Sequence, residues 1–219
     1  MTIINPSIEI LNTPDYGAML RKIERIGRVC YKSEDKISDN SAEGFIRGII
    51  KRGHESVIEH ESITVKVICD RGVTHEIVRH RIASYSQEST RYCNYTADKF
   101  DGHISVVDIS TGFGWDLNDT ATAGKWLIWC HAMDAADKFY QAMISAGATP
   151  EEARSVLPNS TKTEIAMTMN LREWRHFIRL RTSPAAHPQM REVAKIIAEV
   201  FAKWYPVFFE DLEVCNGND

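Results

Sequence analysis

The chain has 219 residues, 43% of them hydrophobic, which is enough for one large domain with a sizeable core. Its formal net charge of −4 argues against a protein that coats duplex nucleic acid, because such proteins concentrate positive charge. A site for an anion must therefore be a local cluster of cations.

The cysteines and the N-terminus favour a cytoplasmic enzyme or binding protein. Five scattered cysteines with no Cys-x-x-Cys pair favour a reducing compartment. The opening MTIINPSIEI has no basic stretch followed by an apolar run, and no uncharged apolar segment is long enough to cross a bilayer. We therefore expect no membrane association.

The first half of the chain mixes helical and extended patterns. Apolar residues at helical spacing after Pro14 predict a first helix, and residues 38–53 predict a second that ends at Gly53. Alternation in ESITVKVICDRG predicts a half-buried strand, and residues 103–110 a second strand that is followed by a loop.

The second half is mainly helical. Residues 120–146 predict a long amphipathic helix, and Thr149 caps a short one that ends at Pro158. Residues 163–170 alternate as a strand, and two further helices are expected over 171–181 and 188–206. With no repeat or linker, we expect a single α/β domain over 1–219.

The helix LREWRHFIRLR carries its cations on two sides. At about 100° per residue, Arg172, His176 and Arg179 form one polar stripe, whereas Arg181 falls on the apolar side. A buried guanidinium needs an anion or carbonyls as partners. Arg181 is therefore either a ligand-binding residue or an ordinary paired or snorkelling arginine.

The stretch RHRIASYSQESTRYCNY (79–95) combines forked cation donors with hydroxyl groups, in Arg79, Arg81, Arg91, Ser84, Ser86, Ser89 and Thr90. These groups suit a phosphate. Together with the arginines of 172–191 they indicate a site for a small phosphorylated or nucleotide ligand, and a solvated surface loop is the alternative.

Other motifs give weaker signals. The histidines of HEIVRH stand at i and i+5, about 140° apart on a helix, so a zinc-protease site is rejected. Cys130 and His131 point about 100° apart, which favours a buried thiol over a nucleophile and base. No Rossmann or P-loop glycine pattern is present.

Four segments resemble the flavin-dependent thymidylate synthases. The first is the signature Arg-His-Arg, seven residues, Ser, found here from Arg79 to Ser89; the others are GHESVIEH, EEARSVLP and MNLREWRHFIRLR, in family order. The resemblance covers roughly residues 50–95 and 145–192.

This resemblance implies a fold, a reaction and an assembly. The fold would be α/β, a mixed sheet with flanking helices, that binds FAD without a Rossmann motif. The reaction would transfer a methylene group from methylenetetrahydrofolate to dUMP and reduce it to methyl with NADPH, giving dTMP without a cysteine nucleophile and without a metal. The assembly would be a homotetramer whose subunits share each site, with no nucleic-acid partner.

The resemblance also implies roles for individual residues. Residues facing FAD would be Ser56, Arg79, His80, Arg81, Gln87, Asn170, Leu171, Arg172 and His176. Residues holding dUMP would be Glu76, Ile77, Val78, Arg79, Gln87, Glu88, Ser89, Thr90, Arg91, Arg154 and Arg181. His54 would lie near the flavin and the folate, and Arg181 would be catalytic because it stabilises the uracil that has lost its N3 proton.

The sequence departs from some relatives at Glu76, where a glutamine is expected, and at His176, where an asparagine is frequent. An acid beside a phosphate would repel it unless the acid faces the ribose or an arginine. The sequence thus leaves the roles of both residues open.

Two other functions also fit parts of the sequence. Arginines interleaved with Tyr85, Tyr92 and Tyr95 would suit single-stranded nucleic acid. His54, Glu59 and His60 would suit a metal-dependent phosphohydrolase, although no third ligand stands at diagnostic spacing from the two histidines.

Overall fold

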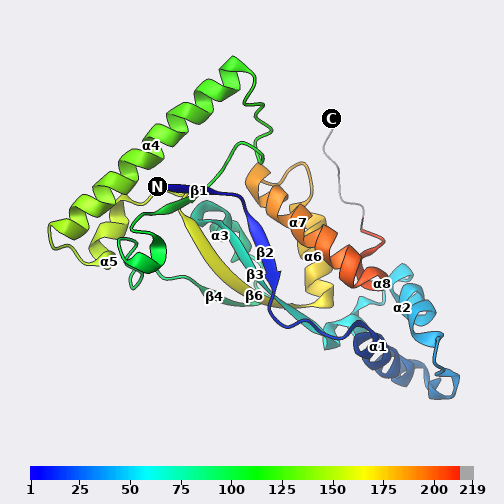
Figure 1. Ribbon diagram of the computed structural model, residues 1–219. Coiled ribbons are helices and arrows are strands. Elements are labelled where there is room, and N and C mark those ends of the chain that lie inside the picture. Colours follow the sequence, from blue (N-terminus) through cyan, green and yellow to red (C-terminus); the bar gives the residue numbers. More distant parts are fainter. Residues whose placement is uncertain (213–219) are drawn as a thin grey trace.

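Two β-sheets form the centre of the computed structural model, which describes residues 1–212 (Figure 1). The larger sheet is antiparallel throughout, in the order β2 (Ser7–Ile10), β3 (Ser62–Asp70), β6 (Lys162–Asn170) and β4 (Ser84–Gln87). The smaller sheet is a parallel pair of β1 (Thr2–Ile4) and β5 (Ser105–Val107). The expected α/β fold with flanking helices is confirmed.

The core lies on one face of the larger sheet because β6, and β3 as far as Cys69, alternate between buried and half-buried side chains. In register, Val65 lies opposite Met167 and Val67 opposite Ile165, and all four side chains are fully buried. Helices α6 (Leu171–Arg181) and α7 (Pro188–Trp204) pack against the same hydrophobic cluster through Trp174 and Phe201, among other residues.

The remaining helices surround this centre. They are α1 (Tyr16–Tyr31), α2 (Ser41–Lys51), α3 (Arg71–Ile77), α4 (Thr120–Ser145), α5 (Pro150–Ala153) and α8 (Pro206–Phe209), with 3-10 turns η1 (Glu34–Lys36), η2 (Glu55–His60), η3 (Asp98–Phe100) and η4 (Arg154–Val156). Side-chain caps begin several of them: Asp15 before α1, Asp70 before α3, and Thr149 with Glu152 as a capping box at α5.

The long helix α4 builds a second hydrophobic cluster. Met133 and Tyr140 pack with Tyr95, Ile104 and Val106, beside the small sheet. The prediction of a helix over 120–146 is confirmed. Helical spacing places Leu127 on the same apolar stripe as Met133 and Tyr140, but Leu127 is 52% exposed, because α4 runs past the rest of the fold (Figure 1).

Several elements were not predicted. The segment 79–95, for which no strand was predicted, holds β4, and its Tyr95 is buried in the second cluster. Residues 71–77 form α3 directly after β3, since Asp70 ends the strand and caps the helix in one step. Among residues 1–212, no helix is both long and apolar enough to cross a membrane.

Three acids gather where α7 meets the end of β3. Glu192 on α7 lies close enough to Asp108 and Asp70 for their negative charges to repel its own carboxylate. Asp70 also accepts a hydrogen bond from the Gln189 side chain at 2.5 Å. Burial, and then the neighbouring carboxylates of Asp108 and Asp70, raise the pKa of Glu192 to about 7. Glu192 therefore carries a proton in the folded protein at pH values where it ionises in the unfolded chain.

The Glu192→Gln variant is expected to unfold with a free energy higher than that of the wild type by about 1 to 3 kcal/mol at pH 8. Because the pKa of Glu192 is raised, the loss of wild-type stability that this carboxyl group causes is absent below pH 4.5, grows as the pH rises toward 7, and is complete above pH 7. Urea unfolding at pH 4.5 and pH 8 measures the difference. Glu199→Gln, an exposed position on the same helix, is the control, and an equal gain at both pH values would contradict the assignment.

Candidate active site

Arg181, at the last turn of α6, is bound on every side of its guanidinium group. Its Nε donates to His80 Nε2 at 2.9 Å, Nη1 to the Glu76 carboxylate at 2.8 Å, and Nη2 to the Glu76 carbonyl at 2.9 Å. The side chain is 13% exposed. The partner that a guanidinium on the apolar side of α6 required is therefore present, and it explains the unusual Glu76: this acid faces an arginine.

His80 follows α3 in a turn that Tyr85 fixes. The Tyr85 hydroxyl, from β4, lies 2.9 Å from the Ile77 carbonyl and 2.6 Å from the His80 carbonyl, and it donates to this pair. The His80 ring is 5% exposed and packs on Phe177. Burial, the Arg181 cation and His176 together lower the pKa of His80 to about 4, so the ring is neutral at pH 7.

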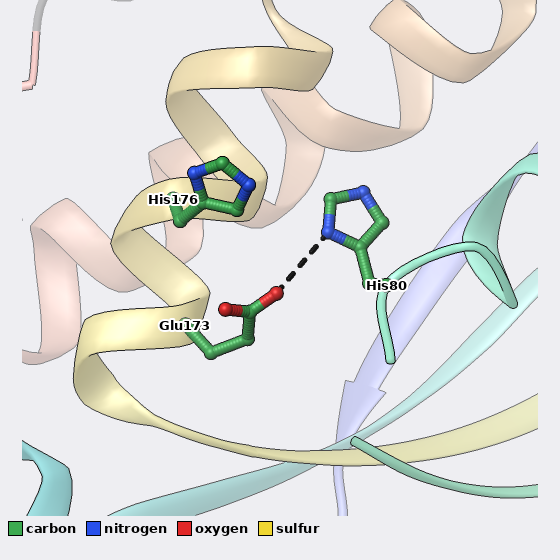
Figure 2. Close-up of side chains that lie close together, drawn as sticks. All are labelled: His80, Glu173 and His176. Atoms are coloured by element: carbon green, nitrogen blue, oxygen red, sulfur yellow. Dashed lines mark hydrogen bonds and ion pairs between the residues drawn. The ribbon is translucent and has the colours of Figure 1, made fainter. Parts of the chain in front are cut away.

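Helix α6 brings two more polar side chains to His80, as Figure 2 shows. Glu173 Oε1 lies 3.3 Å from His80 Nδ1, and the ring of His176 lies 5.9 Å from that of His80. Burial raises the pKa of Glu173, and the charges of His176 and Arg172 oppose that shift. The three residues place a ligand atom each within 4.8 Å of one another.

A cavity of about 470 Å³ opens beside this group, between α6 and η2. Its lining alternates in charge, with Arg172 bound to Glu59 and Arg179 bound to Glu55 at 3.1 Å across the cavity. Asn170 caps α6 by accepting from the Glu173 N–H through its side-chain oxygen, so its amide nitrogen stays available to a ligand. The size is typical of a small-molecule site.

Three of the residues expected at FAD, Asn170, Arg172 and His176, line this cavity. A fourth, His80, is joined to it through Glu173, which is also a lining residue. Ser56 belongs to η2, and His54 is the residue before it. The Tyr31 hydroxyl and His54 Nδ1 form a 2.7 Å hydrogen bond.

The other residues of that set lie differently. Arg79 and Arg81 are exposed on either side of His80, and neither forms an ion pair within residues 1–212. Leu171 is buried in the core and its N–H donates to the Glu61 carbonyl. Gln87 instead donates to the hydroxyls of Thr74 and Thr163.

The residues expected at dUMP fall into two groups. Glu76 binds Arg181 through its carboxylate. Ile77, the next residue, is fully buried, whereas Val78 is exposed. The second group follows β4. Glu88 binds Lys162, and Ser89 and the buried Thr90 come next in the chain. Arg91 lies 4.0 Å from Glu151 of α5, and Arg154 begins η4 directly after α5. Within the described part of the chain, no hydrogen bond or ion pair joins Arg91 or Arg154 to Arg181.

The two alternative functions lose their structural basis. Of the three tyrosines expected to stack on bases, Tyr95 is 3% exposed, Tyr85 is held by its hydroxyl, and Tyr92 alone presents its ring to solvent. Among residues 1–212, His54, Glu59 and His60 do not bring three ligand atoms together, whereas His80, Glu173 and His176 do.

Two residues of the site were missed from the sequence. Tyr85 was assigned to stacking, and Glu173 was given no role. A helical wheel does place Glu173 one turn from Phe177, on the side that turns toward the core, and an acid there is a signal of a buried partner.

The comparisons with known proteins agree with this geometry. Residues 15–207 match the family described as thymidylate synthase complementing protein, and the chain belongs to that family. A flavin-dependent thymidylate synthase from Geobacter sulfurreducens is 35% identical, over 91% of this chain and 83% of the relative. The enzyme of the same name from Pyrococcus furiosus is 34% identical, over 93% and 79%.

One solved structure is similar over nearly its whole length. It is the UMP/dUMP methylase PolB from Streptomyces cacaoi, bound with 5-Br dUMP, with a TM-score of 0.75 and 26% identity over 96% of both chains. The expected family and fold are thereby confirmed.

Proposed function

We propose that this chain is a flavin-dependent thymidylate synthase, which converts dUMP to dTMP with methylenetetrahydrofolate as the carbon donor and NADPH as the reductant. The observation that carries the proposal is the held guanidinium of Arg181 beside a cavity lined by Asn170, Arg172 and His176. Family membership, the relatives' shared name and the dUMP analogue bound to PolB support the same substrate and cofactor class.

The residues around the cavity fit FAD. The exposed guanidinium groups of Arg79 and Arg81 have no carboxylate partner within residues 1–212 and suit a diphosphate, and Arg172 needs only to exchange its exposed partner Glu59. Asn170 and His176 would hold the same group from α6. Bound there, FAD would supply the hydride that completes the methyl group.

Arg181 would act on the nucleotide. A guanidinium group stays charged at any working pH, so in a half-buried position it stabilises the anion that uracil forms when its N3 proton leaves, and C5 gains electron density. Glu76 neutralises Arg181 while the nucleotide is absent, and His80 holds the Nε edge. The remaining dUMP contacts would come from Gln87, Glu88, Ser89, Thr90, Arg91 and Arg154, with Ile77 and Val78 contributing backbone groups.

The site would be completed by neighbouring copies in a homotetramer. Within the described residues no hydrogen bond or ion pair joins Arg91 or Arg154 to Arg181, which supports this, as do the exposed apolar side chains of α4, among them Ile128 at 72% and Phe139 at 65% exposure. We propose in addition that the chain 1–219 acts as a single domain, with His54 close to the folate.

The test is a spectrum and an assay of the purified protein. We expect flavin absorption, and NADPH oxidation that is faster with dUMP than without it, with dTMP detected by mass spectrometry when methylenetetrahydrofolate is added. UMP is tested in parallel, because PolB is described as a UMP/dUMP methylase. A protein that takes up no flavin and forms no methylated nucleotide contradicts the proposal.

A further inference from the structure

The contact between Arg181 and His80 determines which nitrogen of the His80 ring carries a proton. An arginine Nε–H donates and never accepts, so His80 Nε2, 2.9 Å away, must present its lone pair. A neutral imidazole with a bare Nε2 has its proton on Nδ1. The low pKa of His80, about 4, agrees with a neutral ring.

The Nδ1 proton has one carboxylate to receive it. Glu173 Oε1 lies 3.3 Å from His80 Nδ1, and Figure 2 shows the carboxyl group turned from α6 toward the ring. Glu173 is 9% exposed, and Asn170 fixes the start of its helix by accepting from the Glu173 N–H. Glu173, His80 and Arg181 thus form a row of two hydrogen bonds in which each donor faces an acceptor.

The rest of the His80 environment does not replace this carboxylate. Phe177 packs against the ring at a centroid distance of 4.7 Å, and Tyr85 binds the backbone carbonyl of His80. His176 stands edge-on to the ring, and no hydrogen bond joins the two histidines within the described residues. Among the described residues, Glu173 is therefore the group that receives the Nδ1 proton, while Arg181 donates to the bare Nε2.

We propose that Glu173 is a positioning residue, which holds His80 as the Nδ1–H tautomer so that Nε2 accepts from Arg181 and keeps its guanidinium group directed at the nucleotide. The proposal rests on the function proposed for Arg181. It assigns to Glu173, which also lines the cavity, a task that acts through two other side chains and does not require contact with substrate or flavin.

A divalent cation held by His80, Glu173 and His176 is the competing interpretation of the same cluster. It would need a ring nitrogen of His80, yet Nε2 already faces the Arg181 Nε–H and Nδ1 faces Glu173. A cation at Nδ1 would place the ring proton on Nε2, opposite another donor, and would add a positive charge beside Arg181. Positioning therefore accounts for both hydrogen bonds of the His80 ring, and a metal does not.

The experiment compares Glu173→Leu with Glu173→Gln in the protein as purified, labelled with ¹⁵N-histidine. In wild type and Glu173→Gln, whose amide oxygen still accepts, the long-range ¹H–¹⁵N spectrum is expected to show His80 with a protonated Nδ1 and a bare Nε2. In Glu173→Leu we expect that pattern to be lost. The His80 signal is identified by its absence from His80→Gln.

Turnover is measured in the same variants. We expect dTMP formation to fall by about 10²-fold in Glu173→Leu, as for a displaced catalytic group, with retained flavin binding, and by less than about 10-fold in Glu173→Gln. Glu24→Leu removes another buried carboxyl group, from α1, and should leave the His80 pattern unchanged.

Two outcomes would overturn the proposal: an unchanged His80 tautomer in Glu173→Leu, or a loss in Glu173→Gln as large as in Glu173→Leu. Zinc titration of the wild type gives a third, because stoichiometric binding that Glu173→Leu abolishes would favour the metal. The ring tautomer is measured without turnover, so the spectrum tests the role of Glu173 independently of the reaction. If the wild type formed no dTMP, the proposed function would be wrong, and the tautomer result would still be valid.

Discussion

The Arg181→Ala variant is expected to fold and to bind flavin like the wild type, and to form dTMP about 10²- to 10³-fold more slowly. The reason is that its guanidinium group is the mostly buried cation that we propose binds the nucleotide, whereas the cavity lined by Asn170, Arg172 and His176 does not include it. Removing it also leaves the Glu76 carboxylate without its cation at the place proposed for the uracil anion. Single-turnover dTMP formation and flavin absorbance measure the two properties separately.

Two further variants make this prediction specific. Arg181→Lys keeps a charge but cannot contact His80, the Glu76 carboxylate and the Glu76 carbonyl in the geometry of the guanidinium group, so it should recover only part of the rate. Arg47→Ala removes an equally ion-paired but exposed arginine of α2 and should leave the rate unchanged. Wild-type turnover in Arg181→Ala, or an equal loss in Arg47→Ala, would contradict the role of Arg181.

The sequence was informative where one helix face decided the outcome. The wheel of residues 171–181 placed Trp174, Phe177 and Ile178 inside and Arg172, His176 and Arg179 outside, and the exposures confirm both faces. The same wheel showed that Arg181 needs a partner. It could not show which one, because Glu76 and His80 approach from a segment about 100 residues earlier in the chain.

The shorter elements could not be predicted, because pairing across the chain forms them. Strand β4 has four residues with polar outer side chains, and it exists because its backbone pairs with β6, from Ser84 opposite Thr168 to Gln87 opposite Ile165. Likewise β2 pairs with β3 and β1 with β5. Local periodicity carries no information about such partners.

The site is assembled by the strand order. Because β4 lies beside β6, Tyr85 reaches the turn after α3, and because α6 begins at the end of β6, Glu173 and Arg181 reach the same turn. Three segments thus meet at His80: the turn after α3, strand β4 and helix α6. The signature Arg-His-Arg is therefore also a structural junction, and its middle residue is a buried histidine with an exposed arginine on each side.

One arginine of α6 was overlooked entirely. Arg175 is fully buried, donates in bidentate fashion to Asp211 at 2.6 Å and 2.6 Å, and also donates to Glu55 at 3.1 Å and to the Phe208 carbonyl. It joins α6 to η2 and to the chain after α8. Burial raises the pKa of Glu55, but Arg179 and Arg175 outweigh it, so the net pKa lies below its ordinary value.

Replacing Arg175 by Ala should lower the free energy of unfolding by about 3 to 5 kcal/mol, because Glu55 is left partly buried without its buried cation and the Phe208 carbonyl loses its donor. Arg179→Ala is the matched control: Arg179 binds the same Glu55 oxygen at 3.1 Å, but its side chain is 49% exposed, so its loss should cost no more than about 1 kcal/mol. Urea unfolding of both variants at one protein concentration, followed by tryptophan fluorescence, measures the difference. Equal losses would mean that the shared contact with Glu55, and not burial of Arg175, determines the stability of this junction.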